Sequence, residues 1–326
     1  MEKAKHHQYD VRASIDLSKF PTVKGYNFEN KFDFGKFLDS YATTGFQASN
    51  ISQAISIINL MRKEKATIFL AHTSNVTSSG LRDIVRHLVK HKHIQVLVTT
   101  AGGIEEDIIK CLAPFHVGSF EIPGRYLFEH GVARIGNLLA PNDRFALFEE
   151  FMVPVLQKFY EKHKGKETGS VAELIRMMGK EINDENSVLY WAYKNQIPVF
   201  CPAITDGATG DQIYFAKQRY KDFALDIADD MKQIVNVALN SEKTGVIILG
   251  GGSAKHFVLN ANIFHDGCDY AVYVNTGQEF DGSDSGARVD EAITWAKVKP
   301  NAPNVKVYCD ATIAFPLIVA GAFSRK

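Results

Sequence analysis

Short apolar runs alternate with helical segments along most of this chain, and this alternation restricts the fold more than any other feature. The first complete unit leads from an apolar run over 66–71, through a helical segment over 81–90, to a second apolar run over 94–99. Strands that alternate with helices indicate βαβ units around a parallel sheet. The sequence therefore predicts an α/β fold: a doubly wound, mostly parallel sheet with helices on both faces, plus extra helices.

Hydrophobic periodicity predicts the individual elements. The expected strands cover 66–71, 94–99, 197–201, 245–249, 270–275 and 305–309. The expected helices cover 32–41, 51–65, 81–90, 104–112, 144–162, 170–180, 187–194, 222–240 and 290–298. Residues 72–80 are expected to form a loop. We find no linker and no internal repeat, so we expect one α/β domain over 25–326, preceded by an N-terminal arm over 1–24.

Composition excludes several classes of function. Of the 326 residues, 45% are hydrophobic and 23% are charged, and the formal net charge is zero. No stripe of lysines and arginines with interleaved aromatic residues is present, so we expect no nucleic-acid partner. The apolar runs are too short or too interrupted to span a bilayer, so we expect no membrane partner.

The cysteines and histidines indicate neither disulfides nor a metal site. The polar N-terminus shows no secretory signal. The four cysteines are scattered without paired spacing, which is typical of reduced thiols and a cytoplasmic location; they are Cys111, Cys201, Cys268 and Cys309. His87, His91 and His93 have a ligand-like spacing but lie in a basic helix end and the loop after it. We therefore expect no metal ion.

Three expected strand ends lead into glycine-rich turns, over 99–103, 206–210 and 250–252. Such turns let backbone N–H groups approach a phosphate, and the following helix adds positive potential. Each turn alone also fits a tight structural turn, but together they indicate a nucleotide cofactor, as in Rossmann-like folds. Glu106 and Asp310 are candidates to hold ribose hydroxyls, although Glu106 also fits an acidic residue near a helix N-terminus.

An acidic loop follows the expected strand 270–275. It places five carboxylates near a single cation, Arg288; they are Glu279, Asp281, Asp284, Asp290 and Glu291. A concave acidic loop attracts a small cation. The alternative is a solvated turn, with Asp290 and Glu291 at a helix N-terminus.

Two residues near this loop are candidates for proton and group transfer. Lys297 lies two residues after Trp295, and a desolvated lysine beside an aromatic ring is a nucleophilic amine. A surface lysine over the ring is the alternative. His256 follows the 250–252 turn and suits a base at neutral pH, unless it has only a structural role. A lysine nucleophile with a redox cofactor suggests imine chemistry.

Several motifs closely resemble those of the deoxyhypusine synthase family. The acidic loop is the most specific of them, and the similarity extends from about 25 to 323. The matching segments are Asn275–Arg288 with Trp295–Lys297, Thr73–Asn75 with Ser78–Gly80, Val98–Gly103 with Glu105–Asp107, Arg134–Leu138, Gly179–Asn183 and Thr205–Gly207. Phe257 stands where the family usually has a second histidine, and Gly277 where it usually has alanine.

The resemblance implies a function and a set of site residues. The implied reaction is the NAD-dependent transfer of the aminobutyl group of spermidine, through an imine on the enzyme, to a lysine of the precursor of translation initiation factor 5A. Lys297 matches the lysine nucleophile and His256 the base. The implied NAD contacts are Ser74, Asn75, Thr100, Ala101, Glu106, Asp206, Thr276, Gly277, Ser285, Asp310 and Ala311. The implied spermidine contacts are Glu105, Glu106, Asp211, Gly251, His256, Gly282, Asp284, Glu291 and Trp295.

The resemblance also implies a cytoplasmic homotetramer with active sites between paired subunits. Three alternatives stay open. A homospermidine synthase of the same lineage would pass the aminobutyl group to putrescine. A catalytically silent paralogue would only activate a partner, although it should have lost Lys297. An NAD-consuming deacylase would need a zinc–cysteine cluster or its own histidine motif, and neither is visible.

Overall fold

A six-stranded, fully parallel sheet forms the centre of the protein. The computed structural model describes residues 14–324. The sheet has the order β6-β2-β1-β7-β8-β9, and all its neighbouring strands pair in parallel. The strands are β1 (Thr67–His72), β2 (Val96–Val98), β6 (Val199–Phe200), β7 (Thr244–Leu249), β8 (Tyr270–Asn275) and β9 (Asn304–Tyr308). Counted along the chain within this sheet, the order is 3-2-1-4-5-6, that of the dinucleotide-binding Rossmann fold. The predicted fold class is confirmed.

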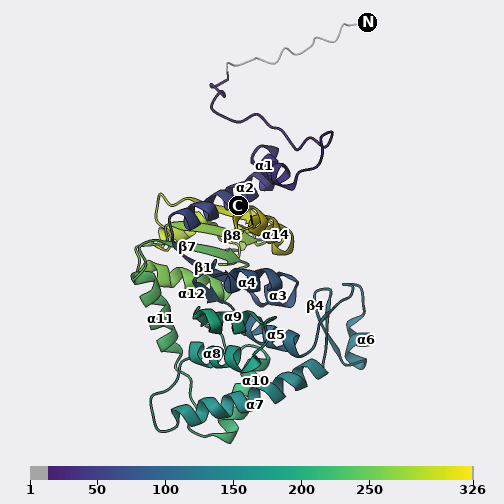
Figure 1. Cartoon of the computed structure of the whole chain (residues 1–326), viewed down its shortest axis with the longest axis vertical. Helices are drawn as coiled ribbons and strands as arrows, with labels where there is room; N and C mark the ends of the chain where they lie inside the picture. The colour runs from purple at the N-terminus through teal and green to yellow at the C-terminus, as the bar shows by residue number, and fades with distance from the viewer. Residues whose placement is uncertain (1–13, 325–326) are drawn as a thin grey trace.

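Helices cover both faces of the sheet because successive strand residues point to opposite sides. On β1, Ile68 and Leu70 join one buried cluster, and Phe69 and Ala71 join the other. The first cluster includes α2 (Phe46–Lys63), α4 (Leu81–Lys90) and α14 (Ala311–Ala322). The second includes α11 (Ile227–Leu239), α12 (Gly252–Ile263) and α13 (Val289–Thr294). Both layers are visible in Figure 1.

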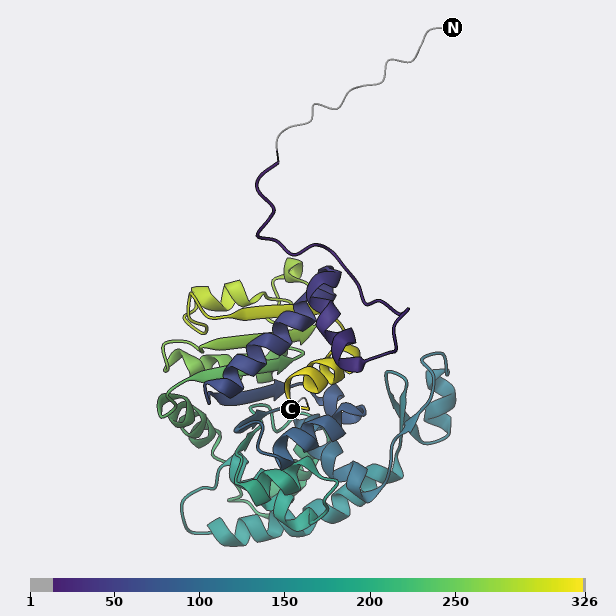
Figure 2. The same cartoon turned by 45° about the horizontal axis from the view of Figure 1, so that its top comes forward.

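A long insertion between β2 and β6 builds the lower half of the molecule (Figures 1 and 2). Its helices are α5 (Ala101–Leu112), α6 (Gly124–Glu129), α7 (Asp143–His163), α8 (Val171–Ile182) and α9 (Val188–Asn195), and α10 (Ala208–Arg219) follows β6. A small antiparallel sheet, in the order β3-β5-β4, projects from the body together with α6. Its strands are β3 (His116–Val117), β4 (Val132–Ile135) and β5 (Leu138–Pro141).

The prediction missed this small sheet because its strands are two to four residues long and mostly solvent-accessible. The expected loop over 72–80 was also wrong. Residues Ser74–Ser78 form the short helix α3, in which Val76 is buried. The glycine-rich turn after β2 is instead mostly the first turn of α5, which begins at Ala101.

Two further helices differ from the prediction. The helix expected over 222–240 begins only at Ile227, because Asp226 accepts hydrogen bonds from the N–H groups of Ala228 and Asp229 and caps it there. Helix α14 was not predicted at all. It is apolar on nearly all sides and contains Pro316, so it has little helical periodicity.

The N-terminal segment leads away from the body. Residues 14–33 contain neither helix nor strand, and α1 (Phe34–Thr44) then packs against α2. Residues 1–13, most of the expected arm, lie outside the described residues, and the expected domain boundaries stay a prediction. Within residues 14–324, no helix is both long and apolar enough to cross a membrane. The same range holds no group of three or more His, Cys, Asp or Glu residues arranged to hold a metal ion.

Candidate active site

The carboxyl ends of all six parallel strands meet at one edge of the sheet, and a crevice lies there. Its neighbouring strands β1 and β7 mark the point where the strand order reverses, which is where such folds bind dinucleotides. The crevice has a volume of about 270 Å³. Four predicted cofactor residues line it: Asn75, Thr276, Asp310 and Ala311.

The other predicted cofactor residues also follow strand ends. Ser74 begins α3 after β1, Thr100 and Ala101 begin α5 after β2, and Asp206 lies in the loop after β6. Gly277 and Ser285 belong to the loop after β8, 276–288, which we call the site loop. The side chain of Asp310 accepts hydrogen bonds from Thr312 at the start of α14, so it also serves as a helix cap.

Glycine is required where the 250–252 turn meets the site loop. Gly250 has a φ of 89°, a left-handed conformation that favours glycine. A Cβ at Gly251 would lie 2.4 Å from the Cα of Ser285. The turn therefore fixes how closely the site loop approaches the N-terminus of α12.

Buried carboxylates occupy α5 next to the crevice. Glu106 is 8% exposed and accepts a hydrogen bond from the Ser78 hydroxyl. Burial raises the pKa of Glu106 to about 7, and the neighbouring charge of Glu105 adds to this effect. Burial also raises the pKa of Glu105, which accepts hydrogen bonds of 2.7 and 2.9 Å from the backbone and hydroxyl of Thr209.

A second hollow, of about 410 Å³, lies between α12, the site loop and α13; we call it the amine hollow. Six residues predicted from the sequence line it: His256, Gly282, Asp284, Glu291, Trp295 and Lys297. The predicted nucleophile, the predicted base and most of the predicted spermidine contacts thus share one hollow. The site loop borders both hollows, since Thr276 lines the crevice and Asp284 lines the amine hollow.

Asp284 is the central charge of the amine hollow. Its Oδ1 lies 3.4 Å from Nε2 of His256. Its Oδ2 is buried and has no hydrogen-bond partner among the described residues. A buried carboxylate oxygen without a partner is costly, so this atom is a candidate to receive a cationic ligand.

Lys297 enters the hollow from the turn after α13. Ala296 has a φ of 55°, and this left-handed residue turns the chain back into the parallel bridge between Val298 and Cys268. Nζ of Lys297 lies 5.9 Å from the ring centroid of Trp295. The ring itself is 65% exposed. The expected burial of this lysine beside Trp295 is therefore not found in the single chain, where the hollow is partly open.

The structure does not bring all the predicted spermidine contacts together. Glu105, Glu106 and Asp211 follow β2 and β6, and none of them is among the described residues that line the amine hollow. Gly251 does not line the hollow either, and it lies against Ser285 of the site loop. The candidate site is thus divided into an amine hollow with the lysine and a separate acidic group.

The prediction missed Lys255, which lines the amine hollow and is 1% exposed. Its ammonium donates hydrogen bonds to the carbonyl oxygens of Asp284 and Ala287. In the sequence, Lys255 stands where the dinucleotide-binding pattern G-x-G-x-x-G, begun at Gly250, would have its last glycine. Its direct proximity to His256 was the available signal.

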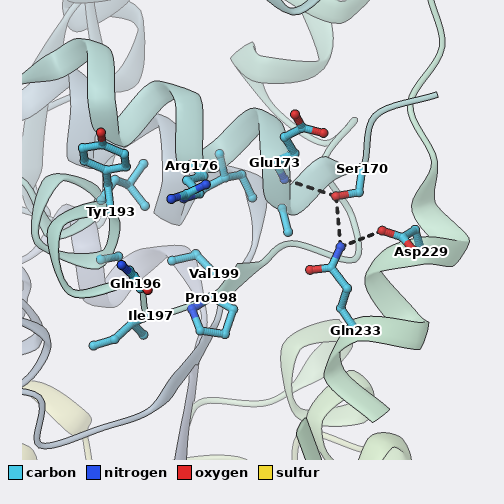
Figure 3. A pocket seen from close by; sticks show the side chains of 14 residues that line it. Ser170, Glu173, Arg176, Tyr193, Gln196, Ile197, Pro198, Val199, Asp229 and Gln233 are labelled. Carbon is cyan, nitrogen blue, oxygen red and sulfur yellow. Dashed lines mark hydrogen bonds between the residues drawn. The ribbon is translucent and has the colours of Figure 1, made fainter. Parts of the chain in front are cut away.

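Another hollow of about 410 Å³ lies beside β6, away from every predicted site residue (Figure 3). Its polar groups bind one another. The Gln233 amide donates to Ser170 and to Asp229, and Ser170 accepts from the backbone of Glu173. The chemistry of the amine hollow, rather than size, therefore identifies the candidate site.

Fold and site together define the class: an α/β enzyme with a dinucleotide-binding switch point and a charged hollow, in which Asp284 and Glu291 lie with Lys255, Arg288 and Lys297. Comparison with known proteins gives the family. The sequence model of the family "Deoxyhypusine synthase" matches residues 36–322. The chain belongs to the deoxyhypusine synthase family, and the enzyme class expected from the sequence is confirmed.

Curated relatives and a solved structure agree with this assignment. The chain is 50% identical to deoxyhypusine synthase of Musa acuminata, over 96% of this chain and 90% of that protein. It is 47% identical to deoxyhypusine synthase of Arabidopsis thaliana, over 94% of this chain and 91% of that protein. A solved structure of a candidate deoxyhypusine synthase from Entamoeba histolytica superimposes with a TM-score of 0.69, at 33% identity, and covers 93% of this chain and 97% of that one.

Proposed function

We propose that this protein transfers the aminobutyl group of spermidine to a lysine of the translation initiation factor 5A precursor, with NAD as cofactor and Lys297 as nucleophile. One observation carries the proposal. The amine hollow gathers Lys297, His256 and Asp284 beside a loop that also borders the dinucleotide crevice.

The crevice fits NAD. Thr100 Oγ1 is buried without a hydrogen-bond partner among the described residues, next to the N-terminus of α5. The N-termini of α3, α5 and α14 all lie at this edge, where backbone N–H groups favour a pyrophosphate. We assign NAD binding to the predicted residues, with Asn75, Thr276 and Asp310 at the centre. When bound, NAD supplies the chemistry of hydride transfer.

The amine hollow suits a polyamine. Asp284 and Glu291 offer negative charge to its ammonium groups, and Trp295 offers a ring face. The carboxylates offset part of the cost of removing a polycation from water. His256, held beside Asp284, is placed to take the proton that the secondary amine must lose before it is oxidised.

Lys297 carries the transferred group. Its neutral amine adds to the carbon of the oxidised polyamine, the bond from that carbon to the departing nitrogen breaks, and 1,3-diaminopropane leaves. The aminobutyl group then remains on Lys297 as an imine. The acceptor lysine displaces Lys297 by the same exchange, and the hydride that was removed from spermidine would then be returned to the new imine, which yields deoxyhypusine.

A second copy of the chain completes the site in this proposal. The separation of Glu105, Glu106 and Asp211 from the amine hollow is what subunits that share an active site would show. Large apolar side chains near the hollow are exposed in the single chain, including Phe264 at 55% and Phe280 at 87%. We propose a homotetramer in the cytoplasm, where free cysteines persist. Sedimentation should give the mass of four chains, and a monomer active on its own would contradict this part.

Mass spectrometry tests the reaction. The purified protein is incubated with spermidine, NAD and the factor precursor, and the precursor lysine should gain one aminobutyl group. Putrescine offered in place of the precursor tests the homospermidine synthase alternative, since only that enzyme would favour putrescine. A chain that modifies neither acceptor would favour the silent paralogue.

A further inference from the structure

Two lysines bind the backbone of the site loop: Lys255, which is buried, and Lys306, which is partly exposed. On α12, Lys255 donates hydrogen bonds to the carbonyl oxygens of Asp284 and Ala287, beside the amine hollow. On β9, Lys306 donates to the carbonyl oxygens of Gly277 and Gly286, at 2.8 and 2.6 Å. The loop has little regular structure of its own, so these contacts fix much of its shape.

Lys255 is buried more deeply than its charge alone would favour. Its side chain is 2% exposed, and its Nζ lies 4.9 Å from the ring centroid of Tyr273 and 3.8 Å from Oδ1 of Asp284. The Tyr273 hydroxyl is buried with no hydrogen-bond partner among the described residues, so it does not anchor the ammonium. Burial lowers the pKa of Lys255, and the charge of Asp284 counteracts this. Burial of an ammonium is costly to stability, so we attribute the presence of Lys255 here to the contacts that it makes.

What it holds is Asp284. Lys255 binds the carbonyl oxygen of Asp284 and, three residues later, that of Ala287. These two contacts fix the backbone of the site loop from 284 to 287. The same ammonium attracts Oδ1, which also faces His256. This leaves Oδ2 without a partner among the described residues.

We propose that Lys255 is a positioning residue, which holds Asp284 so that its carboxylate stays beside His256 and in the wall of the amine hollow, where it attracts an ammonium group of the polyamine. This rests on the proposed function, because the ligand of the amine hollow is taken to be spermidine. Lys255 acts mainly on the segment that carries Asp284, and Lys306 acts mainly on the segment that carries Gly277.

The paired variants Lys255→Met and Lys306→Met test this division. Each removes an ammonium and keeps a side chain of similar length. NADH formation from spermidine needs no acceptor and gives the KM for spermidine, and fluorescence titration gives the Kd for NAD. For Lys255→Met we expect the KM for spermidine to rise about tenfold or more, with the NAD Kd within about twofold. For Lys306→Met we expect the opposite pattern.

A double-mutant cycle separates positioning from general loosening. If Lys255 acts through Asp284, then Lys255→Met should add little to the defect of Asp284→Asn. Additive effects, or equal weakening of both ligands by both lysine variants, would overturn the proposal. Lys217→Met, which removes a lysine that is bound to the Phe223 carbonyl and lines neither hollow, is the matched control.

Two outcomes keep this test distinct from the proposed function. If the wild-type protein forms no NADH with spermidine, the proposed function fails before the variants are compared. If Lys255→Met does not fold, Lys255→Arg enters the same cycle, because it retains charge and donors. A rise in the KM for spermidine that vanishes in the Asp284→Asn background supports the proposal, and an unchanged KM overturns it.

Discussion

Lys297 is the residue on which the proposed chemistry depends most directly. We expect Lys297→Ala to reduce aminobutyl transfer by at least about 10³-fold. The other lysine that lines the amine hollow, Lys255, is already hydrogen-bonded to the carbonyl oxygens of Asp284 and Ala287. NAD binding should stay within about twofold, since Lys297 does not line the crevice. Mass spectrometry of the precursor and an NAD titration measure the two effects. Lys232→Ala, at an exposed lysine, is the control, and full activity of Lys297→Ala would refute the nucleophile assignment.

We expect Asp284 to contribute to spermidine binding and hardly at all to NAD binding. We expect Asp284→Asn to weaken spermidine binding about tenfold to a hundredfold, because it removes the charge that faces the ammonium. Calorimetry with spermidine and with NAD gives the two affinities. Asp281→Asn changes an exposed carboxylate of the same loop that bonds only locally, so it should behave like wild type. Equal weakening of spermidine and NAD binding would contradict the assignment of Asp284 to the spermidine site in the amine hollow.

At the scale of elements, the turn between β7 and α12 fixes the geometry of the site. In Gly251→Ala the new methyl group would overlap the Ser285 backbone, so the site loop must move. We expect at least about tenfold weaker binding of spermidine, with little change in thermal stability. Gly80→Ala places a methyl group in open space and is the control. Unchanged spermidine binding in Gly251→Ala would show that the contact is not needed.

Asp107 joins three helices, and its role is structural. It is fully buried, bonds to Arg82 at 2.7 Å, and accepts hydrogen bonds from the hydroxyl of Ser187 and the N–H groups of Val188 and Leu189 at the start of α9. Asp107→Ala leaves the buried Arg82 unpaired, so we expect a loss of about 3–5 kcal/mol in the free energy of unfolding. Urea denaturation measures it. Asp83→Ala, at an exposed carboxylate, should change stability by less than about 0.5 kcal/mol.

The sequence predicted the elements that have strong periodicity and strong end signals. Helix α4 matches its predicted bounds, and Ser170, the first residue of the helix predicted over 170–180, is the N-cap of α8. Elements defined by tertiary contact were missed. The strands β3 to β5 are stabilised mainly by pairing with one another, and α14 lacks an amphipathic pattern because Phe315 and Ile318 are buried against α2 and α4. Lys255 was missed because burial of a lysine leaves no pattern in a sequence.

At the scale of the whole molecule, buried titratable groups make stability depend on pH. The pKa of Glu106 rises from 4.5 to about 7 in the folded protein. Between these values the unfolded chain releases its proton first, so the contribution of Glu106 to stability falls as pH rises and levels off above about 7. In the wild type, we expect this effect to lower the free energy of unfolding by about 2–3 kcal/mol across this pH range. In Glu106→Gln this decrease should be absent.

Unfolding free energies of wild type and Glu106→Gln, measured from pH 4.5 to 8, isolate this effect. The effect is read from the difference between the two proteins, because other buried groups titrate in the same pH range. Asp230, with its pKa raised to about 6, acts in the same direction. His72, with its pKa lowered to about 4, gains stability as pH rises toward 6.5 and acts in the opposite direction. Parallel curves for the two proteins would show that Glu106 is not titrating as described.

The site loop borders both the dinucleotide crevice and the amine hollow, so both proposed ligands lie against the same segment. Gly277 and Gly286 pack backbone against backbone, so Thr276 on the cofactor side cannot shift without disturbing the segment that carries Asp284. Two binding events that share one movable wall are thermodynamically linked. By whatever factor the dinucleotide changes the affinity for the polyamine, the polyamine must change the affinity for the dinucleotide by the same factor.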